Sequence, residues 1–410
     1  MITLVEARGF RSLEHLRQPL GPFHVLAGPS GSGKSTFLDV ITFLGAVTAR
    51  GLSTATTECA PRLQDLSFQH RAQPIELAIE VTVPDAIRRR LGNPAFETLR
   101  YEIGVETDTE SGEPALVEER VSLKASEQGA AKQLEMFPRL GSAASTILTS
   151  KLVSGSGRTI VHKVQGGNDN FYSETYQESG KGWLVAYRLG RRRSALSHLP
   201  EDETKFPASL WFKRLLAEHV HALAPDPRRL RRPSPPGQPA AFRPDGENLP
   251  WVLAALQEQH PERARRWVEH VQAALPDLTD VQSVQRDEDR HRYLVLRGQN
   301  GVDIPSWSAS DGVLRFLALT LPAFLPDTTG LWLVEEPETG LHPRAAQAAL
   351  NALASISSAQ VLITTHSPAV IRAADPGNIL CFSRREDGAT TVSPGREKLD
   401  PAAWQEAALR

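Results

Sequence analysis

The sequence predicts an α/β fold, with a parallel core, an antiparallel β subdomain and a mostly helical insert. Three observations predict this class. First, a short apolar strand at 23–27 runs into a glycine-rich loop, after which apolar residues recur at helical spacing. Second, two apolar runs that start at Leu331 and Val361 end in polar side chains, as buried parallel strands typically do. Third, apolar and polar residues alternate between 75 and 123, which indicates an antiparallel meander.

The composition is that of an ordinary globular protein: 410 residues, 40% hydrophobic and 23% charged, with a net charge of −2. This balance does not indicate nucleic-acid binding, so any such surface would be a local patch. Two cysteines, Cys59 and Cys381, exclude a disulfide scaffold or a four-thiolate zinc site. The first residues lack a basic, apolar leader, and no run approaches ~18 apolar residues. We therefore expect a cytoplasmic protein without a membrane span.

The elements fall into three stretches. Residues 1–125 hold a strand at 2–5, the glycine-rich loop and the antiparallel strands. Residues 126–242 are an insert or lid region, poorly patterned up to 175, with a helix at 208–223 and a proline-rich segment at 228–237 that predicts an exposed linker. Residues 243–410 return to the core, and their patterns predict helices at 249–258 and 261–274 and a strand at 293–296.

The loop Gly28-Pro29-Ser30-Gly31-Ser32-Gly33-Lys34-Ser35-Thr36 fits G-x-x-x-x-G-K-[ST], the phosphate-binding pattern of P-loop NTPases. Glycines allow backbone N–H groups to curl around phosphate oxygens, and a helix start adds partial positive charge. Lys34 is expected at the β- and γ-phosphates, and the Ser35 hydroxyl on Mg²⁺. A chance glycine turn is the alternative, but both flanks carry the strand and helix patterns that the chemistry needs.

Two further stretches predict the other half of a nucleotide site. Glu335 and Glu336 end one apolar strand, at the carboxyl end where a Mg²⁺ ligand and a catalytic base belong. His366 follows the other strand, and either strand alone could be a core strand with a polar exit. Ser310-Asp311-Gly312 opens an amphipathic helix that could bind a phosphate held by another copy. In isolation, a plain N-capped helix is the simpler interpretation of that segment.

These stretches, in this order, resemble the ABC-type ATPases of the RecF and SMC superfamily, and above all the compact bacterial AAA-family ATPases related to the OLD nucleases. The resemblance covers about residues 1–125 and 243–385. Its most specific part is Glu335-Glu336-Pro337-Glu338-Thr339-Gly340-Leu341-His342-Pro343, followed by Thr365-His366-Ser367-Pro368. Gly9–Leu13 and Asp245–Leu249 also look like this family. The short stretch after residue 385 leaves no room for the Toprim domain of the OLD enzymes, and no sustained heptads indicate an SMC coiled coil.

The resemblance implies a role for each matching residue. Gly28 to Thr36 is the Walker A loop for ATP. Glu335 takes the Mg²⁺-side position of Walker B, where Asp is more usual, and Glu336 is the catalytic carboxylate that orients water. Ser310 and Gly312 belong to the signature loop, Glu338 to His342 form the D-loop, and His366 is the switch histidine, although a lone histidine at a strand end is usually structural. Arg11 resembles an arginine that approaches the phosphates, with a surface role as the alternative. Gln69, chosen over Gln64 and Gln73, is the expected lid glutamine at the metal.

The function that this resemblance implies is ATP hydrolysis by a head that forms a homodimer on Mg-ATP. Its output would drive or gate a DNA-linked process, repair or anti-phage defence, with a partner nuclease or toxin. The alternative is an ATP-dependent dimeric scaffold or sensor with negligible turnover that controls such a partner. A small-molecule kinase needs neither a signature loop nor a D-loop, and no coupling region of a transporter is recognisable. Arginines at 188–193 and 228–232 are candidates for DNA phosphates, with solvated loops as the alternative.

Overall fold

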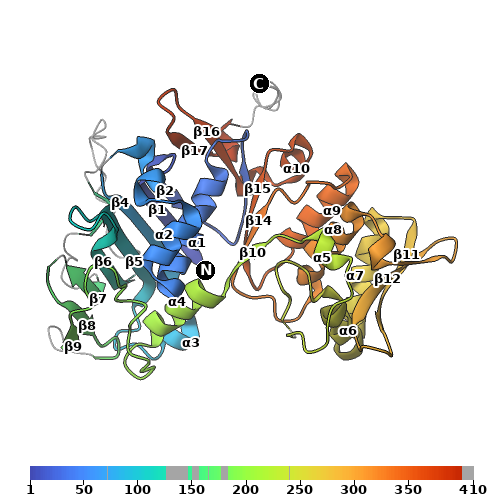
Figure 1. Ribbon diagram of the computed structural model, residues 1–410, viewed down its shortest axis with the longest axis horizontal. Helices are drawn as coiled ribbons and strands as arrows, with labels where there is room; N and C mark the ends of the chain where they lie inside the picture. Colours follow the sequence, from blue (N-terminus) through green and yellow to red (C-terminus); the bar gives the residue numbers. More distant parts are fainter. Residues whose placement is uncertain are drawn as a thin grey trace. The chain divides into compact units, whose positions relative to one another are not determined.

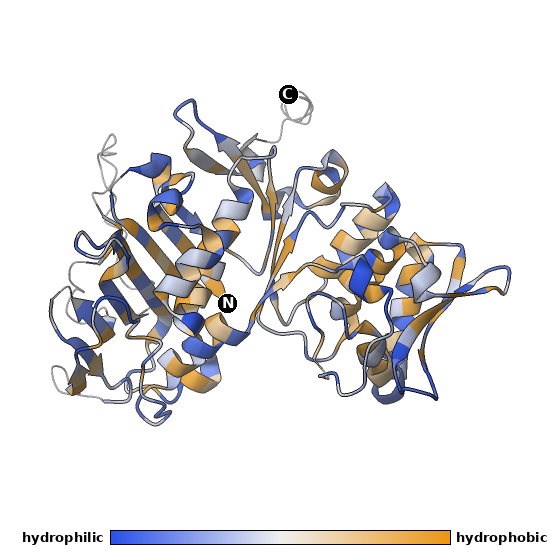
Figure 2. Cartoon of the chain, in the orientation of Figure 1, coloured by the Kyte–Doolittle hydropathy of each residue, from blue (hydrophilic) through white to orange (hydrophobic). Residues whose placement is uncertain are grey.

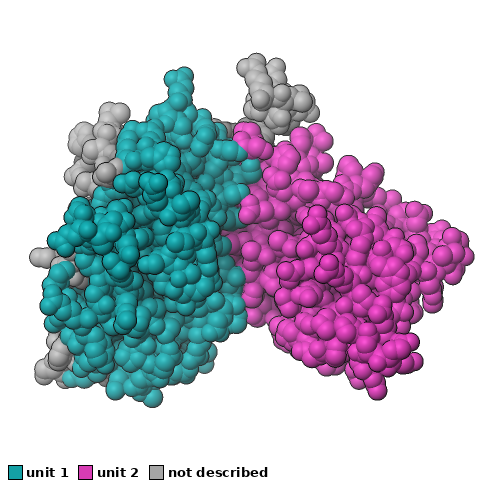
Figure 3. All heavy atoms as spheres, in the orientation of Figure 1, with its two compact units in different colours: residues 1–21, 31–220, 382–392 teal, residues 22–30, 221–381, 393–410 magenta. Residues whose placement is uncertain are grey.

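The computed structural model describes residues 1–71, 73–125, 146–149, 157–164, 166–176, 183–239 and 241–398. The chain divides into two compact units, each assembled from separated stretches (Figure 3). Unit 1 comprises residues 1–21, 31–220 and 382–392, and unit 2 comprises residues 22–30, 221–381 and 393–410. The boundary between the units therefore crosses the glycine-rich loop between Ser30 and Gly31.

Unit 1 is built on an eight-stranded sheet in which neighbouring strands are antiparallel (Figure 1). The strand order is β2-β1-β4-β5-β6-β7-β8-β9. The strands are β1 (Ile2–Phe10), β2 (Leu13–Pro19), β4 (Ile75–Thr82), β5 (Phe96–Thr107), β6 (Pro114–Ala125), β7 (Gly157–Val164), β8 (Asp169–Tyr172) and β9 (Trp183–Tyr187). Strands β4 to β6 confirm the predicted meander. Strands β7 to β9 were not predicted. They are defined by the strands with which they pair, since β7 pairs with β6, β8 with β7 and β9 with β8, rather than by a clear alternating pattern of their own.

The helices of unit 1 are α1 (Lys34–Arg50), α2 (Leu52–Cys59), α3 (Asp85–Arg88) and α4 (Pro207–Glu218), with 3-10 turns at Leu63–Leu66 and Phe68–His70. Helix α1 buries the apolar residues predicted from its spacing, among them Phe37 and Ile41. It packs closely on α4, because a Cβ at Gly45 would lie only 2.7 Å from the Leu216 carbonyl oxygen. The described part of residues 126–242 thus contains strands as well as helices, where a mostly helical insert was expected.

The core sheet has the order β10-β14-β15-β3-β16-β17. Its strands are β3 (Phe23–Ala27), β10 (Val220–Leu223), β14 (Leu331–Glu335), β15 (Gln360–Thr365), β16 (Ile379–Arg384) and β17 (Thr390–Pro394). In unit 2, β14, β15, β3 and the start of β16 run parallel, which confirms the predicted parallel core. The register pairs Glu335 with Thr364 and Thr365 with Ala27, so the carboxyl ends of three strands lie at one edge.

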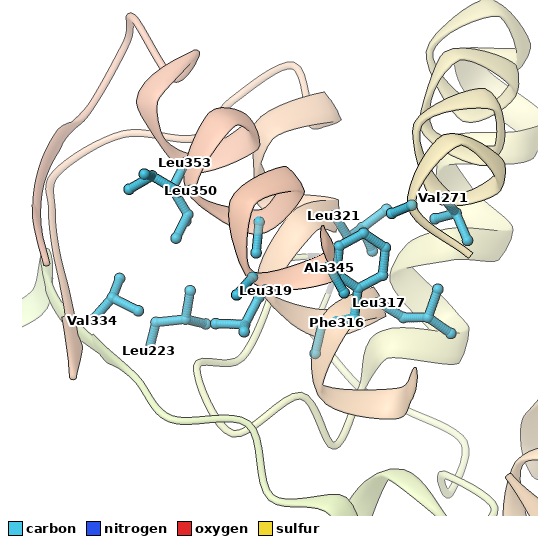
Figure 4. Close-up of a cluster of buried hydrophobic side chains, with 14 of the residues drawn as sticks. Leu223, Val271, Phe316, Leu317, Leu319, Leu321, Val334, Ala345, Leu350 and Leu353 are labelled. Carbon is cyan, nitrogen blue, oxygen red and sulfur yellow. The ribbon is translucent and has the colours of Figure 1, made fainter. Parts of the chain in front are cut away.

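The rest of unit 2 packs around one large core. Its elements are α5 (Pro227–Leu230), α6 (Leu249–Gln259), α7 (Pro261–Ala274), β11 (Leu278–Gln285), β12 (Arg292–Gly298), β13 (Asp303–Pro305), a 3-10 turn at Ser306–Ser308, α8 (Asp311–Thr320), a 3-10 turn at Leu321–Phe324, α9 (Pro343–Ala354), α10 (Pro368–Ala373), a 3-10 turn at Pro376–Asn378 and α11 (Gly395–Lys398). Figure 4 shows Phe316 and Leu319 of α8 among side chains from α9 and β14. The apolar colour of β14 and β15 in Figure 2 matches their burial.

Two stretches between residues 208 and 237 differ from the predictions in part. The predicted helix at 208–223 ends at Glu218, and the chain continues as strand β10. The predicted exposed linker at 228–237 has exposed residues at both ends, but it begins within α5 and buries Leu230 and Ser234. By contrast, α6 and α7 confirm the helices predicted at 249–258 and 261–274, and β12 contains the predicted strand at 293–296. Among the helices that the structure describes, none has the length and apolar character that a bilayer crossing requires.

Candidate functional site

The glycine-rich loop has the backbone of a phosphate cradle at the start of α1. Gly33 is the residue before the helix, with φ 101°, and no side chain caps the first turn. A Cβ at Gly33 would lie 2.2 Å from Thr390 Oγ1 and 3.0 Å from Ser12 Oγ, so glycine alone fits there. Thr390 Oγ1 also lies 3.0 Å from the Ser32 carbonyl oxygen and 2.9 Å from Ser12 Oγ. Ser12 and Thr390, which belong to other stretches of unit 1, therefore support the backbone of the loop at Ser32 and Gly33.

The loop also fits a phosphate chemically. The Ser32 hydroxyl is buried and has no hydrogen-bond partner among the described residues. A buried hydroxyl without a partner costs free energy, and a phosphate oxygen is an acceptor that would satisfy it. Lys34 is buried too, at 5% exposure, which is rare for an ammonium group unless it is paired with an anion or dipoles. Both observations are of the kind expected in an anion site.

Arg11 and Gln69 lie in unit 1 with left-handed backbones, at φ 48° and 52°. The Arg11 guanidinium pairs with the carboxylate of Asp39 on α1 and donates to the Cys59 carbonyl oxygen at 3.1 Å. The Gln69 carboxamide donates to the Asp387 carbonyl oxygen at 2.7 Å and accepts from Arg71. Each side chain is therefore held by neighbours in its own unit, and contact with phosphate or metal would require these bonds to open.

In unit 2 the structure brings Glu336 and His366 together at the carboxyl ends of β14 and β15. Glu336 Oε1 lies 3.0 Å from His366 Nδ1, and both side chains are partly exposed. The Glu336 backbone has φ 44° and donates its N–H to the Thr364 carbonyl oxygen at 3.0 Å. Left-handed backbone costs about 1–2 kcal/mol in a residue with a Cβ, and such strain concentrates at functional sites. Glu335, one residue earlier, is exposed at the end of β14.

The segment after Glu336 is tied to the end of β15. Thr365 Oγ1 donates to Glu338 Oε1 at 2.5 Å and accepts the Ser367 N–H at 3.0 Å. Glu338 Oε2 is buried and has no partner among the described residues. The segment predicted to be the D-loop is therefore anchored through the Glu338 carboxylate, of which one oxygen has a hydrogen bond and the other has none among the described residues.

Ser310 is the N-cap of α8, and its side chain accepts the Val313 N–H at 3.4 Å. The simpler interpretation of this segment, an N-capped helix, is thus true of its geometry. The helix start also touches the D-loop, because a Cβ at Gly312 would lie 2.5 Å from the Gly340 carbonyl oxygen. The sequence-predicted residues Ser310, Gly312, Glu335, Glu336 and His366 all belong to unit 2, whereas Lys34 and Ser35 belong to unit 1.

Several arginines of the two clusters pair with acids of their own units. Arg191 binds Glu106 at 2.6 Å and Asp108 at 2.7 Å, and Arg192 pairs with Glu113. Arg229 binds Asp245 and Glu247, at 2.8 and 3.3 Å. These pairs reduce the positive charge that either cluster presents to a DNA phosphate. No group of three or more His, Cys, Asp or Glu side chains suited to a metal ion is present in the described ranges.

Three residues support the candidate site although no sequence motif assigns them this role. Ser12 and Thr390 support the glycine-rich loop, and Arg231 bonds to the signature loop. Thr390 is 358 residues from Ser32 along the chain, so no local pattern links the two.

Comparison with known proteins agrees with this architecture. Residues 170–372 match the family described as "AAA domain, putative AbiEii toxin, Type IV TA system". No curated protein matches the chain. Many solved structures match the chain, among them two that are similar over almost its whole length. One is an Smc head bound to the C-winged helix domain of ScpA, with 14% identity, 96% of each chain covered and a TM-score of 0.53.

The other is an Smc head with an extended coiled coil, bound to the C-terminal domain of ScpA derived from Pyrococcus furiosus. It has 14% identity, 99% of each chain covered and a TM-score of 0.51. The likeness to Smc heads confirms the predicted fold class, that of a P-loop ATPase head. The chain has the fold of Smc heads, and residues 170–372, just under half of its length, match an AAA domain family.

Proposed function

We propose that the protein hydrolyses ATP. The observation that carries this proposal is the Glu336 carboxylate, held on a strained backbone at the end of a parallel strand and bonded to His366 at 3.0 Å. A carboxylate in that position can accept a hydrogen bond from a water molecule and so orient it for attack. The glycine-rich loop supports the proposal independently, because the start of α1 after Gly33 and the buried Ser32 hydroxyl suit phosphate oxygens.

In this mechanism the loop amides and Lys34 hold the β- and γ-phosphates. Ser35 and Glu335 would hold Mg²⁺, with Gln69 as a further ligand once its own hydrogen bonds open. The bound ion neutralises charge on the phosphate oxygens. Glu336 orients the water whose oxygen attacks the γ-phosphorus, and one water proton passes through the Glu336 carboxylate to the departing phosphate. The bond from the γ-phosphorus to the β–γ bridging oxygen breaks, and ADP and phosphate leave. His366 fixes the orientation of the Glu336 carboxylate through their hydrogen bond and helps to stabilise the negative charge that develops near the γ-phosphate.

The proposed active assembly is a homodimer in which two copies share two sites. In the ABC-type arrangement the signature loop meets the nucleotide of the other copy, so Ser310 and Gly312 of one chain complete the site that Lys34 and Glu336 of its partner begin. A two-fold dimer is the simplest closed solution for a chain with one loop of each kind.

Mixing two inactive variants tests this proposal. Lys34→Ala removes the phosphate contact and Ser310→Ala the signature contact, so each homodimer should lose turnover. Statistical exchange makes half of the dimers mixed, each with one intact site of two. We therefore expect about a quarter of wild-type turnover in the mixture. A mixture as inactive as its parents, with both variants folded by circular dichroism and ATP-bound protein monomeric by light scattering, would refute the shared site.

We further propose a cytoplasmic role in a DNA-linked process, repair or anti-phage defence, with a partner nuclease or toxin. The description of the matching family, which mentions a toxin system, supports a defence role. The structural relatives bound to a domain of ScpA support a protein partner. Turnover measured with and without duplex DNA at low and moderate salt tests the link to DNA, since phosphate contacts weaken steeply with salt. Identical rates with and without DNA at every salt concentration would contradict it.

A further inference from the structure

The signature loop of this chain carries a charge that opposes its proposed ligand. Asp311 directly follows Ser310 and stands in the first turn of α8. The helix dipole stabilises a carboxylate at this position, but the carboxylate repels a phosphate that approaches the same helix start. The side chain of Asp311 is 60% exposed, so solvent weakens this repulsion, and it is strongest when a phosphate lies directly at the helix start. A loop that must bind a triphosphate needs this charge neutralised.

Arg231 is the residue that does so, and it contacts the loop on both sides of Ser310. Its guanidinium pairs with the Asp311 carboxylate through Nη1 and donates to the Ala309 carbonyl oxygen through Nη2 at 2.9 Å. The Arg231 carbonyl oxygen also accepts from the Ser306 hydroxyl at 3.4 Å. A two-pronged guanidinium fixes direction as well as charge, which a lysine cannot do. Residues 309 and 311 are thus held relative to each other by one side chain.

The segment that carries Arg231 is itself anchored. Leu230 is buried and lies against Gly246, where a Cβ would come within 2.8 Å of the Leu230 side chain. Ser234, three residues after Arg231, exchanges two backbone hydrogen bonds with Arg292, at 2.7 and 2.9 Å. Arg231 therefore reaches the loop from a fixed base, so its two contacts are set before any nucleotide arrives.

We propose that Arg231 is a positioning residue for the trans site: it neutralises Asp311 and orients Ser310 toward the γ-phosphate held by a second copy. This inference rests on the shared-site ATPase proposed above. Arg231 belongs to the arginine cluster at 228–232, which the sequence marks as a candidate for DNA contacts. Here it has a role in ATP-dependent dimerisation instead. In this proposal Arg231 acts on the nucleotide only through Ala309 and Asp311, the two residues that it contacts.

The test compares Arg231→Ala and Arg231→Lys with Arg232→Ala, a charge-matched control at an exposed neighbour. Nucleotide binding by the single chain uses the loop at 28–36, so ATP affinity should stay within twofold for all three. Turnover and ATP-driven dimerisation should fall about tenfold or more in Arg231→Ala, the scale of losing a charge-assisted hydrogen bond. Arg231→Lys should recover part of the loss, and the control should match wild type. Adding Asp311→Asn to Arg231→Ala should also restore part of it, because the repelling charge is gone.

Complementation then assigns the residue to its half of the site. Arg231→Ala mixed with Lys34→Ala should regain turnover, whereas mixed with Ser310→Ala it should not, since both changes damage the signature half. Recovery with Ser310→Ala, or unchanged turnover in Arg231→Ala, would overturn the inference. If Lys34→Ala and Ser310→Ala also fail to complement each other, the shared-site proposal itself is wrong. If they complement while Arg231→Ala with Lys34→Ala does not, only the role of Arg231 is wrong.

Discussion

A single methyl group at position 312 tests the contact between α8 and the D-loop. In Gly312→Ala the new Cβ would lie 2.5 Å from the Gly340 carbonyl oxygen, and real Cβ contacts are essentially never under 3.0 Å. The two backbones must therefore separate by about half an ångström or more. A misplacement of ~1 Å can lower the rate about a hundredfold, even when the substitution lies far from the reacting atoms. We therefore expect turnover to fall about tenfold to a hundredfold. Overpacking of this kind costs about 1–3 kcal/mol of stability.

The assay is steady-state phosphate release together with a thermal melt. Gly45→Ala is the matched control, because its Cβ would meet the Leu216 carbonyl oxygen at 2.7 Å, a similar clash between two elements of unit 1. Both variants should melt a few degrees below wild type, but Gly312→Ala should lose more turnover for the same loss of stability. Wild-type turnover and melting temperature in Gly312→Ala would refute the reasoning, since the structure leaves no space for the methyl group.

Three further predictions follow from buried and strained groups. Burial raises the pKa of Glu174 to about 7, against the N–H groups of the α4 start that favour its charged form. The protonated Glu174 carboxyl therefore contributes its full stabilisation below pH ~4.5, and that contribution is lost as pH rises from ~4.5 through 7. The melting temperature of the wild type should fall over this range and level off above it, while Glu174→Gln shows a flatter profile. Glu336→Gln should keep ATP binding but lose at least ~10²-fold in turnover; if only Glu335→Gln stops turnover, the two carboxylates have the opposite roles. Thr390→Val should weaken ATP binding several-fold in isothermal titration and lower the free energy of unfolding by about 1–2 kcal/mol in denaturant. The control is Thr391→Val, which also loses a hydrogen bond. Equal ATP affinities of the two variants would contradict the support that Thr390 gives the loop.

Local patterns alone identify the loop at 28–36, the apolar strands that end at Glu335 and Thr365, and the helix that starts at Asp311. Each depends on neighbours in sequence: glycine spacing, an apolar run, or an N-cap followed by helical periodicity. These features also carry the resemblance to ATPase heads, which the comparisons bear out for the fold. The roles of the individual residues stay predictions until the variants are measured.

The tertiary structure decided what no local pattern encodes. Thr390 behind Gly33, the left-handed backbone of Glu336, and Arg231 on the signature loop all depend on contacts between residues far apart in the chain. The same reason explains the differences from the predictions. Strands β7 to β9 form because β6 leaves an edge on which β7 can pair, and the segment at 228–237 is anchored because Leu230 and Ser234 are buried. A periodic pattern records which face of an element is apolar, but not which distant partner will cover that face or cap its end.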